Sequence, residues 1–157
     1  MIIKDILDNE WQCNCIGCSI STGEVIPPGG IIRETENFIL HQDPEIPIKG
    51  FLIIASKKHI KSISQLSHEE SQELFDLVYK ARHALESIDD IKEVSIIQEE
   101  RSSHFHLWLL PRYQWMDDIC INSLSTIREI MNYARENCKT TKYINEILMT
   151  VELIREF

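Results

Sequence analysis

The segment 104–110 carries two histidines and a tryptophan at alternate positions, His104, His106 and Trp108. Alternate residues of a β-strand share one face, so the pattern predicts that these three side chains point the same way. Successive residues on that face lie about 6.6 Å apart, at a rise of about 3.3 Å per residue. Two imidazoles at this spacing can serve one site without binding the same metal ion. The apolar residues between them favour such a site over a strand with two merely solvated histidines.

A second group of reactive side chains lies near the start of the chain, where Cys13, Cys15 and Cys18 fall within six residues. A C-x-x-C pair bends back to place two thiolates on one zinc ion, and Gly17 would ease that turn. The chain has five cysteines, an odd number, and it opens without an export signal. These features predict free thiols in a reducing, cytoplasmic compartment.

Two histidines can complete a zinc site that begins with this cysteine pair. His59 follows two lysines at the end of an apolar run, and His104 opens the histidine segment. Two thiolates and two imidazoles make a closed tetrahedral site of the structural type. The candidate ligands are Cys15, Cys18, His59 and His104. Cys13 can replace Cys15 in an alternative pairing, and spacing alone gives equal weight to unrelated buried cysteines.

Length, charge and glycine content exclude several classes of protein. The 157 residues suit one domain, 1–157, and no repeat or low-complexity segment is visible. A formal net charge of −9 argues against a general binder of nucleic acid or anionic membranes. The longest apolar runs fall far short of the ~20 residues that cross a membrane. All five glycines lie at or before Gly50, and neither GxGxxG nor GxxxxGK[ST] occurs, which excludes the usual Rossmann and P-loop sites.

The hydrophobic pattern predicts an α+β fold that would position these side chains. Apolar and alternating runs indicate about five strands. They are 31–33, 38–41, 51–55, 94–97 and 104–110. Ser67 and Glu70 fit a capping box, and the helix behind them keeps one apolar face to about Ser87. We expect this long helix to pack on a mainly antiparallel sheet, after a loop-rich first 30 residues that open with a short helix or turn.

Beyond Pro111 the strand pattern ends and a C-terminal helical extension is expected over about 120–157. Apolar residues at helical spacing run from Leu124 to Ala134 and from Ile144 to Ile154. These helices are expected to serve packing or dimerisation rather than catalysis.

Three motifs together resemble the histidine triad (HIT) superfamily. They are Cys15-Ile-Gly-Cys18, the run from Phe51 through Lys57-Lys58-His59, and Ser103-His104-Phe-His106-Leu-Trp108-Leu-Leu-Pro111-Arg112. Their order and separations also match, over roughly residues 13–112. The superfamily consists of nucleotidyl transferases and hydrolases that act on the α-phosphate of nucleotides. The resemblance implies an α+β fold with a five-stranded antiparallel sheet and, as in many members, a homodimer.

The resemblance also implies roles for individual residues. His106 occupies the position of the histidine that attacks phosphorus, and Asp43 the position of the acidic residue that holds the ribose hydroxyls. Zinc-bearing members use the ligands that correspond to Cys15, Cys18, His59 and His104, the same set as above. Neutral imidazole, with a pKa of about 6.5, is a competent nucleophile at cellular pH and would form a nucleotidyl-His106 intermediate. The implied substrates are nucleotides or their conjugates, such as nucleoside phosphoramidates and dinucleoside polyphosphates.

Trp108 departs from the family pattern because it replaces the third histidine. Hexose-1-phosphate uridylyltransferases carry glutamine there, so the position accepts a hydrogen-bond donor. Tryptophan offers a single indole N–H on a much larger ring. Three roles are open with equal weight: donating to a phosphate oxygen, stacking on a base, or filling the pocket.

The phosphate loop is the second departure, because the family's glycine-rich stretch is replaced by Glu99-Glu100-Arg101-Ser102-Ser103. Gln98 takes the place of the usual asparagine. Arg101, Ser102 and Ser103 can offer donors to phosphate, although Arg101 can equally pair with a neighbouring glutamate. We therefore interpret the chain as a HIT-like hydrolase or transferase, or alternatively as a zinc-stabilised nucleotide- or partner-binding module.

The remaining basic side chains have weaker assignments. Lys57 and Lys58 are interpreted as solvated lysines at the end of a strand rather than as a phosphate site. His41, His68 and His83 have no partner in the sequence, and the helix around His68 and His83 predicts surface positions for both.

Overall fold

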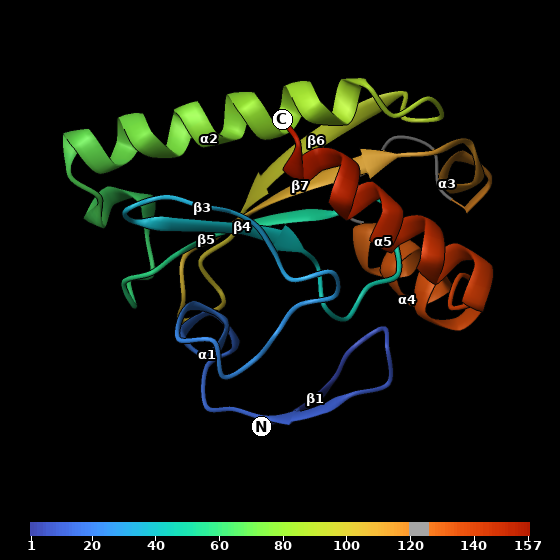
Figure 1. Cartoon of the computed structure of the whole chain (residues 1–157), viewed down its shortest axis with the longest axis horizontal. Coiled ribbons are helices and arrows are strands. Elements are labelled where there is room, and N and C mark those ends of the chain that lie inside the picture. Colours follow the sequence, from blue (N-terminus) through green and yellow to red (C-terminus); the bar gives the residue numbers. More distant parts are fainter. Residues whose placement is uncertain (120–125) are drawn as a thin grey trace.

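A five-stranded antiparallel sheet forms the centre of the computed structural model, which describes residues 1–119 and 126–157. Its strands are β3 (Ile31–Glu34), β4 (Phe38–Gln42), β5 (Leu52–Ser56), β6 (Glu93–Gln98) and β7 (His106–Arg112). They lie in the order β3-β4-β5-β7-β6, so β7 is inserted between β5 and the edge strand β6 (Figure 1). The predicted α+β class and antiparallel sheet are confirmed.

The long helix α2 (His68–Glu86) packs on one face of this sheet (Figure 1). It begins with the predicted capping box: the Ser67 hydroxyl accepts from the Glu70 N–H, and the Glu70 carboxylate accepts from the Ser67 N–H. Such a cap satisfies two backbone donors that the first turn would leave unpaired. The helix ends against Ser87, where the sequence predicted. Its buried side chains are Glu70, Leu74, Leu77, Val78, Ala81, Ala84 and Leu85.

The other face of the sheet is covered in part by the N-terminal segment, which holds α1 (Ile16–Ser21) and a hairpin of β1 (Ile2–Lys4) and β2 (Glu10–Gln12) (Figure 1). The short opening helix that was one of the two expectations is not formed: residues 2–12 make two paired strands joined by a turn. The buried Asp5 carboxylate closes the hairpin, accepting from the N–H groups of Leu7 and Asn9. Asp8 takes a positive φ of 68° within the same turn.

Three helices and a short 3-10 turn complete the described chain. The 3-10 turn η1 (Ile63–Gln65) precedes α2, and α3 (Gln114–Ile119) follows β7. The two expected C-terminal helices are α4 (Ile127–Asn137) and α5 (Thr141–Arg155), which contribute to the cores on opposite faces of the sheet. The expectation for Leu124 lies outside the described residues.

The last strand starts two residues later than predicted, at His106 rather than His104. Within the ladder, His106 pairs with Ala55 and Trp108 with Ile53. Before it, the Phe105 N–H donates to the Ile60 carbonyl, 2.6 Å away, because the chain leaving β5 has turned across this end of the sheet. His104 is therefore positioned by the turn after β5.

Among the described residues, no helix has the length and apolar character needed to span a membrane.

Candidate metal site and active-site cavity

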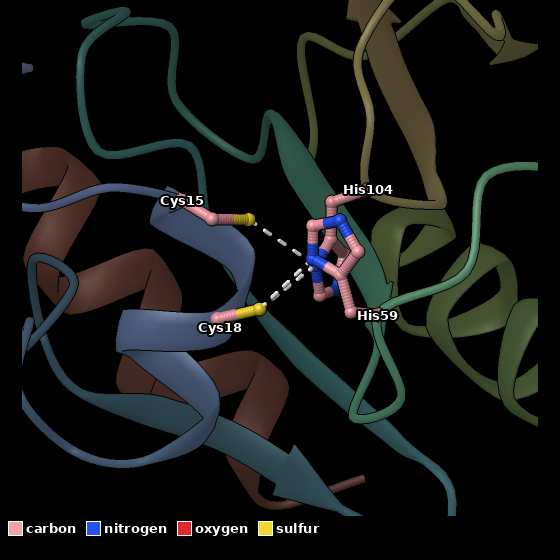
Figure 2. A group of neighbouring side chains, drawn as sticks. All are labelled: Cys15, Cys18, His59 and His104. Atoms are coloured by element: carbon pink, nitrogen blue, oxygen red, sulfur yellow. Dashed lines mark hydrogen bonds between the residues drawn. The ribbon is translucent and has the colours of Figure 1, made fainter.

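Four side chains from three separate segments converge at one end of the sheet (Figure 2). They are Cys15, Cys18, His59 and His104, and their ligand atoms all lie within 4.8 Å of one another. The His104 Nδ1 lies 3.4 Å from His59 Nδ1 and 3.5 Å from Cys18 Sγ. Tetrahedral zinc with bonds of about 2.05 Å to nitrogen and 2.3 Å to sulfur would place such pairs roughly 3.3 and 3.6 Å apart. The donor set and its spacing therefore fit a tetrahedral metal ion.

The tautomer of His104 is fixed by a bond on the side away from the cluster. Its Nε2 lies 2.6 Å from the Ser56 carbonyl oxygen, which can only accept, so Nε2 carries the proton. Nδ1 then faces the two thiols with its lone pair. Burial lowers the pKa of His104, which keeps the ring neutral. A second bond of this kind orients a histidine ligand and raises its basicity.

Gly17 lies inside α1, and its role differs from the one the sequence suggested. The expectation that Gly17 eases a turn is wrong, because it lies within the helix and is not among the glycines with positive φ. A Cβ at this position would lie only 2.6 Å from Cδ2 of His104. The missing side chain therefore makes room for the imidazole to lie against the first turn of α1.

Cys13 stands apart from this cluster. It is 6% exposed and belongs to the apolar core beneath the N-terminal segment. Of the two pairings left open by the spacing, the structure groups Cys15 and Cys18 with the histidines.

A cavity of about 330 Å³ opens beside this cluster, between α1 and the sheet. Cys15 and His104 reach its wall, and so does His106. The His106 Nδ1 lies 3.0 Å from the His104 carbonyl oxygen and 3.2 Å from the Ser102 hydroxyl. Since the carbonyl only accepts, Nδ1 carries the proton and Nε2 keeps the lone pair. His104 thus presents its ring to the metal cluster and its carbonyl to His106.

Trp108 follows His106 on the cavity side of β7. Its ring meets the Phe51 ring edge-on at 5.9 Å and lies 5.8 Å from the His106 ring. Across residues 1–119 and 126–157, no protein group accepts a hydrogen bond from its indole N–H. The ring is therefore packed on two sides while its only donor stays available.

Asp43 lies just past the end of β4 and lines the same cavity. Its Oδ1 accepts from the N–H groups of Glu45 and Ile46, at 2.9 and 2.8 Å. Burial raises the pKa of the Asp43 carboxyl to about 7, although these two bonds act in the opposite direction. The second carboxylate oxygen remains for a ligand.

The loop before His104 is divided between the cavity and the solvent. Ser102 and Ser103 line the cavity, whereas Arg101 is exposed and lies outside it. Gln98 pairs with Leu107, and directly opposed residues share a face, so its side chain is on the α2 side of the sheet. The structure thus brings Ser102 to His106 and Ser103 to the same cavity, and it leaves Gln98 and Arg101 away from His106.

The two lysines before His59 are held by carboxylates. Lys57 Nζ lies 2.7 Å from a Glu34 carboxylate oxygen, and Lys58 pairs with Glu70. These ion pairs connect the turn that carries His59 to β3 and to α2.

His41 is a cavity residue to which the sequence assigned no role. It lies on β4, is 2% exposed and lines the cavity opposite α1. A lone histidine in an apolar strand has no partner in the sequence. The only available signal was its i,i+2 spacing from Asp43, which places both residues on one face.

By sequence, the chain matches no family model and no curated protein. Solved structures do match its fold. A HIT family protein from Bacillus anthracis shares 23% identity at a TM-score of 0.60, covering 88% of this chain and 95% of its own. A Zn-bound histidine triad family protein from Mycobacterium smegmatis shares 18% identity at a TM-score of 0.58, covering 88% and 94%. A hypothetical histidine triad nucleotide-binding protein from Sulfolobus tokodaii shares 18% identity at 0.60, covering 90% of each chain.

These similarities define the class of fold: the chain has the α+β fold of histidine triad proteins. Within that fold it carries a Cys₂His₂ cluster at the end of the sheet and a histidine-lined cavity next to it.

Proposed function

We propose that the protein is a HIT-type nucleotide hydrolase or nucleotidyl transferase with His106 as its nucleophile. The observation that carries this proposal is the tautomer of His106, whose Nδ1–H is committed to the His104 carbonyl. The unprotonated Nε2 is then the nitrogen available for attack, in a cavity of about 330 Å³. Ser102 and Ser103 line the same cavity, and we propose that their hydroxyls turn to the phosphate when a ligand binds.

The proposed reaction has two balanced steps. Nε2 of His106 forms a bond to the α-phosphorus as the bond from phosphorus to the leaving group breaks, and the leaving group keeps the electron pair. Water or another acceptor then attacks the phosphorus, loses a proton and releases His106. The Asp43 carboxylate would hold the ribose hydroxyls. Trp108 would donate its free indole N–H to a phosphate oxygen, the role that its packing and its unpaired donor favour among the three.

Zinc is the proposed cofactor, bound by Cys15, Cys18, His59 and His104. With four protein ligands it has no open position, so its contribution is structural. His104 links the two sites, because the residue that would bind the metal also accepts the Nδ1–H bond of His106.

The test is turnover of a substrate panel by wild type and His106→Ala. The panel contains nucleoside phosphoramidates, dinucleoside polyphosphates and nucleotide sugars. Loss of the nucleophile should lower turnover by more than about 1,000-fold, while circular dichroism and metal content stay unchanged. The exposed His68→Ala variant is the matched control. The indole N–H of Trp108 can donate a hydrogen bond but cannot transfer its proton as a general acid. We therefore expect phosphate leaving groups, which are stable as anions, to depart faster than amines. Equal turnover by wild type and His106→Ala would reject the proposal.

A nucleotide- or partner-binding module is the second candidate. The exposed Arg101 and the loop without glycine favour it, since they leave few donors for a polyphosphate. The placement of Ser102 against His106 favours the enzyme. Mass spectrometry after mixing with substrate separates the two, because a nucleotidylated His106 occurs only in the enzyme.

We also propose a homodimer, which the resemblance to HIT proteins implies, and a cytoplasmic location, which the free cysteines favour. Light scattering after size exclusion would give a mass of twice 18.4 kDa for the dimer. A monomeric mass at all concentrations would contradict it.

A further inference from the structure

His41 occupies the middle of the cavity-facing surface of the sheet. It pairs with Ile53 across β4 and β5, and Ile53 pairs with Trp108 across β5 and β7. The three side chains form one cross-strand row, and all three line the cavity. His41 is thus buried by its neighbours while its ring borders the space where a substrate would lie.

The hydrogen bonding of His41 defines what it can offer. Its Nδ1 lies 2.8 Å from the Gln42 carbonyl oxygen, so Nδ1 carries the proton and Nε2 is an acceptor. Burial lowers the pKa of His41 to about 4, which keeps the ring neutral at physiological pH. Among the described residues no group makes a hydrogen bond to Nε2. This nitrogen is also not among the fully buried side-chain atoms that lack a partner, so it can be reached from the cavity. It is therefore an open acceptor on an apolar wall.

His41 also lies between the two residues assigned to opposite parts of a nucleotide. The His106–Ala55 row is next along the sheet, two residues from the row of His41. On the other side, Asp43 follows His41 by two residues, about 6.6 Å along the strand. A nucleotide with its phosphorus at His106 and its ribose at Asp43 must cross the row that contains His41.

We propose that Nε2 of His41 accepts a hydrogen bond from the nucleoside part of the substrate and selects for ligands with a donor there. This inference rests on the proposed function, because it uses a nucleotide bound between His106 and Asp43. The donor is either a ribose hydroxyl or an N–H of the base. A ligand without it would displace water from Nε2 and leave the acceptor unpaired, which costs binding free energy.

The experiment is calorimetric titration of wild type and His41→Phe with nucleoside 5′-monophosphates, measuring Kd without any need for turnover. Phenylalanine keeps the ring and removes the acceptor. For the nucleotide that wild type binds most tightly, the variant should bind about 10- to 100-fold more weakly. His68→Phe, on the exposed first turn of α2, should bind as wild type does.

Ligand analogues identify the donor. Removal of the donor from the ligand should weaken binding to wild type about 10- to 100-fold more than binding to His41→Phe. A loss with the 2′- or 3′-deoxy nucleotide that occurs in wild type and not in His41→Phe assigns the contact to the ribose, whereas a loss common to both proteins belongs to Asp43. A loss with inosine in place of guanosine, or purine riboside in place of adenosine, assigns it to the base.

Two outcomes overturn the inference. One is unchanged Kd values for His41→Phe with every nucleotide that wild type binds. The other, which also decides the matter if His41→Phe does not fold, is a wild-type Kd that changes by less than about threefold across all the analogues. Failure of wild type to bind any nucleotide would instead reject the proposed function itself.

Discussion

At the α1 end of the cavity, the His104 ring is held by the Ser56 carbonyl and lies against α1, where Gly17 leaves room for it. The segment 98–103 brings Ser102 and Ser103 to the cavity, where the Ser102 hydroxyl donates to the His104 carbonyl, while Arg101 lies in solvent. Both regions border His106, but only the first gathers four potential ligand atoms within 4.8 Å of one another. We infer from this difference that the position of His106 is set from the His104 end, whereas contacts to a phosphate would form mainly when a ligand binds.

The largest effect should follow from removing one ligand of the candidate metal site, by Cys15→Ser. If free zinc exceeds the Kd a thousandfold, binding stabilises the fold by about 4 kcal/mol, or roughly 8–16 °C in Tm for a chain of this size. We expect zinc content, measured by elemental analysis, to fall from one equivalent to below about a tenth, and the Tm to fall with it. Cys138→Ser, a free cysteine outside the cluster, should leave both unchanged.

Cys13→Ser decides between the two pairings. Because Cys13 lies in the core, its variant should keep the full equivalent of zinc. A loss of zinc in Cys13→Ser, with zinc retained in Cys15→Ser, would contradict the ligand set.

A smaller effect is expected from Gly17→Ala, which leaves all four ligands in place. Its Cβ would overlap the His104 ring, so the ring or α1 must shift. Overpacking of this kind costs about 1–3 kcal/mol, and a displaced ligand should weaken zinc binding by about 10- to 100-fold. Competition with a chromogenic chelator measures the affinity, and urea denaturation the stability. Zinc affinity equal to that of wild type would show that the close approach is not required.

The smallest effect concerns the part of the cavity that contains Asp43, and it is measured through the titration of that carboxyl. Burial raises the pKa of this carboxyl to about 7, whereas an unfolded aspartate titrates near 3.9. The folded state therefore holds the proton more tightly, and the stability contributed by Asp43 is lost as the pH rises through 7. Between pH 6.5 and 8, the free energy of unfolding should fall by about 1 kcal/mol more in wild type than in Asp43→Asn.

The pH window matters because His41 acts in the opposite direction. Its pKa is lowered to about 4, so its contribution is lost as the pH falls below about 6.5. Urea denaturation above pH 6.5 therefore isolates Asp43. Parallel stability curves for wild type and Asp43→Asn in that range would refute the raised pKa.

Most of the fold could be predicted because its signals are local. The capping box at Ser67 and the apolar face of α2 lie within one segment, and four of the five strands follow from apolar runs. The start of β7 could not be predicted, because alternation continues through His104 and Phe105 while their bonds go to Ser56 and Ile60. The N-terminal hairpin depends on one buried carboxylate, Asp5, which composition does not reveal.

The candidate site divides in the same way. The spacing of Cys15 and Cys18, with two histidines elsewhere, is a motif that can be read along the chain. The placement of His41 and Gln98 depends on strand register: one is opposite Ile53 on the cavity side, and the other is opposite Leu107 on the α2 side. Register is set by the assembled sheet, so nothing local excludes Gln98, and the only local sign of His41 is its i,i+2 spacing from Asp43.

The insertion of β7 between β5 and β6 has a consequence for the order of folding. Cys18 and His104 are separated by 86 residues, and the strand after His104 is central in the sheet although it is the last to be made. At about 5–20 residues per second of synthesis, the cysteine pair would wait roughly 4–17 s for its second histidine. During that interval the two thiols are open to oxidation and to other metals, so we expect zinc to bind late and to lock a sheet that is already assembled.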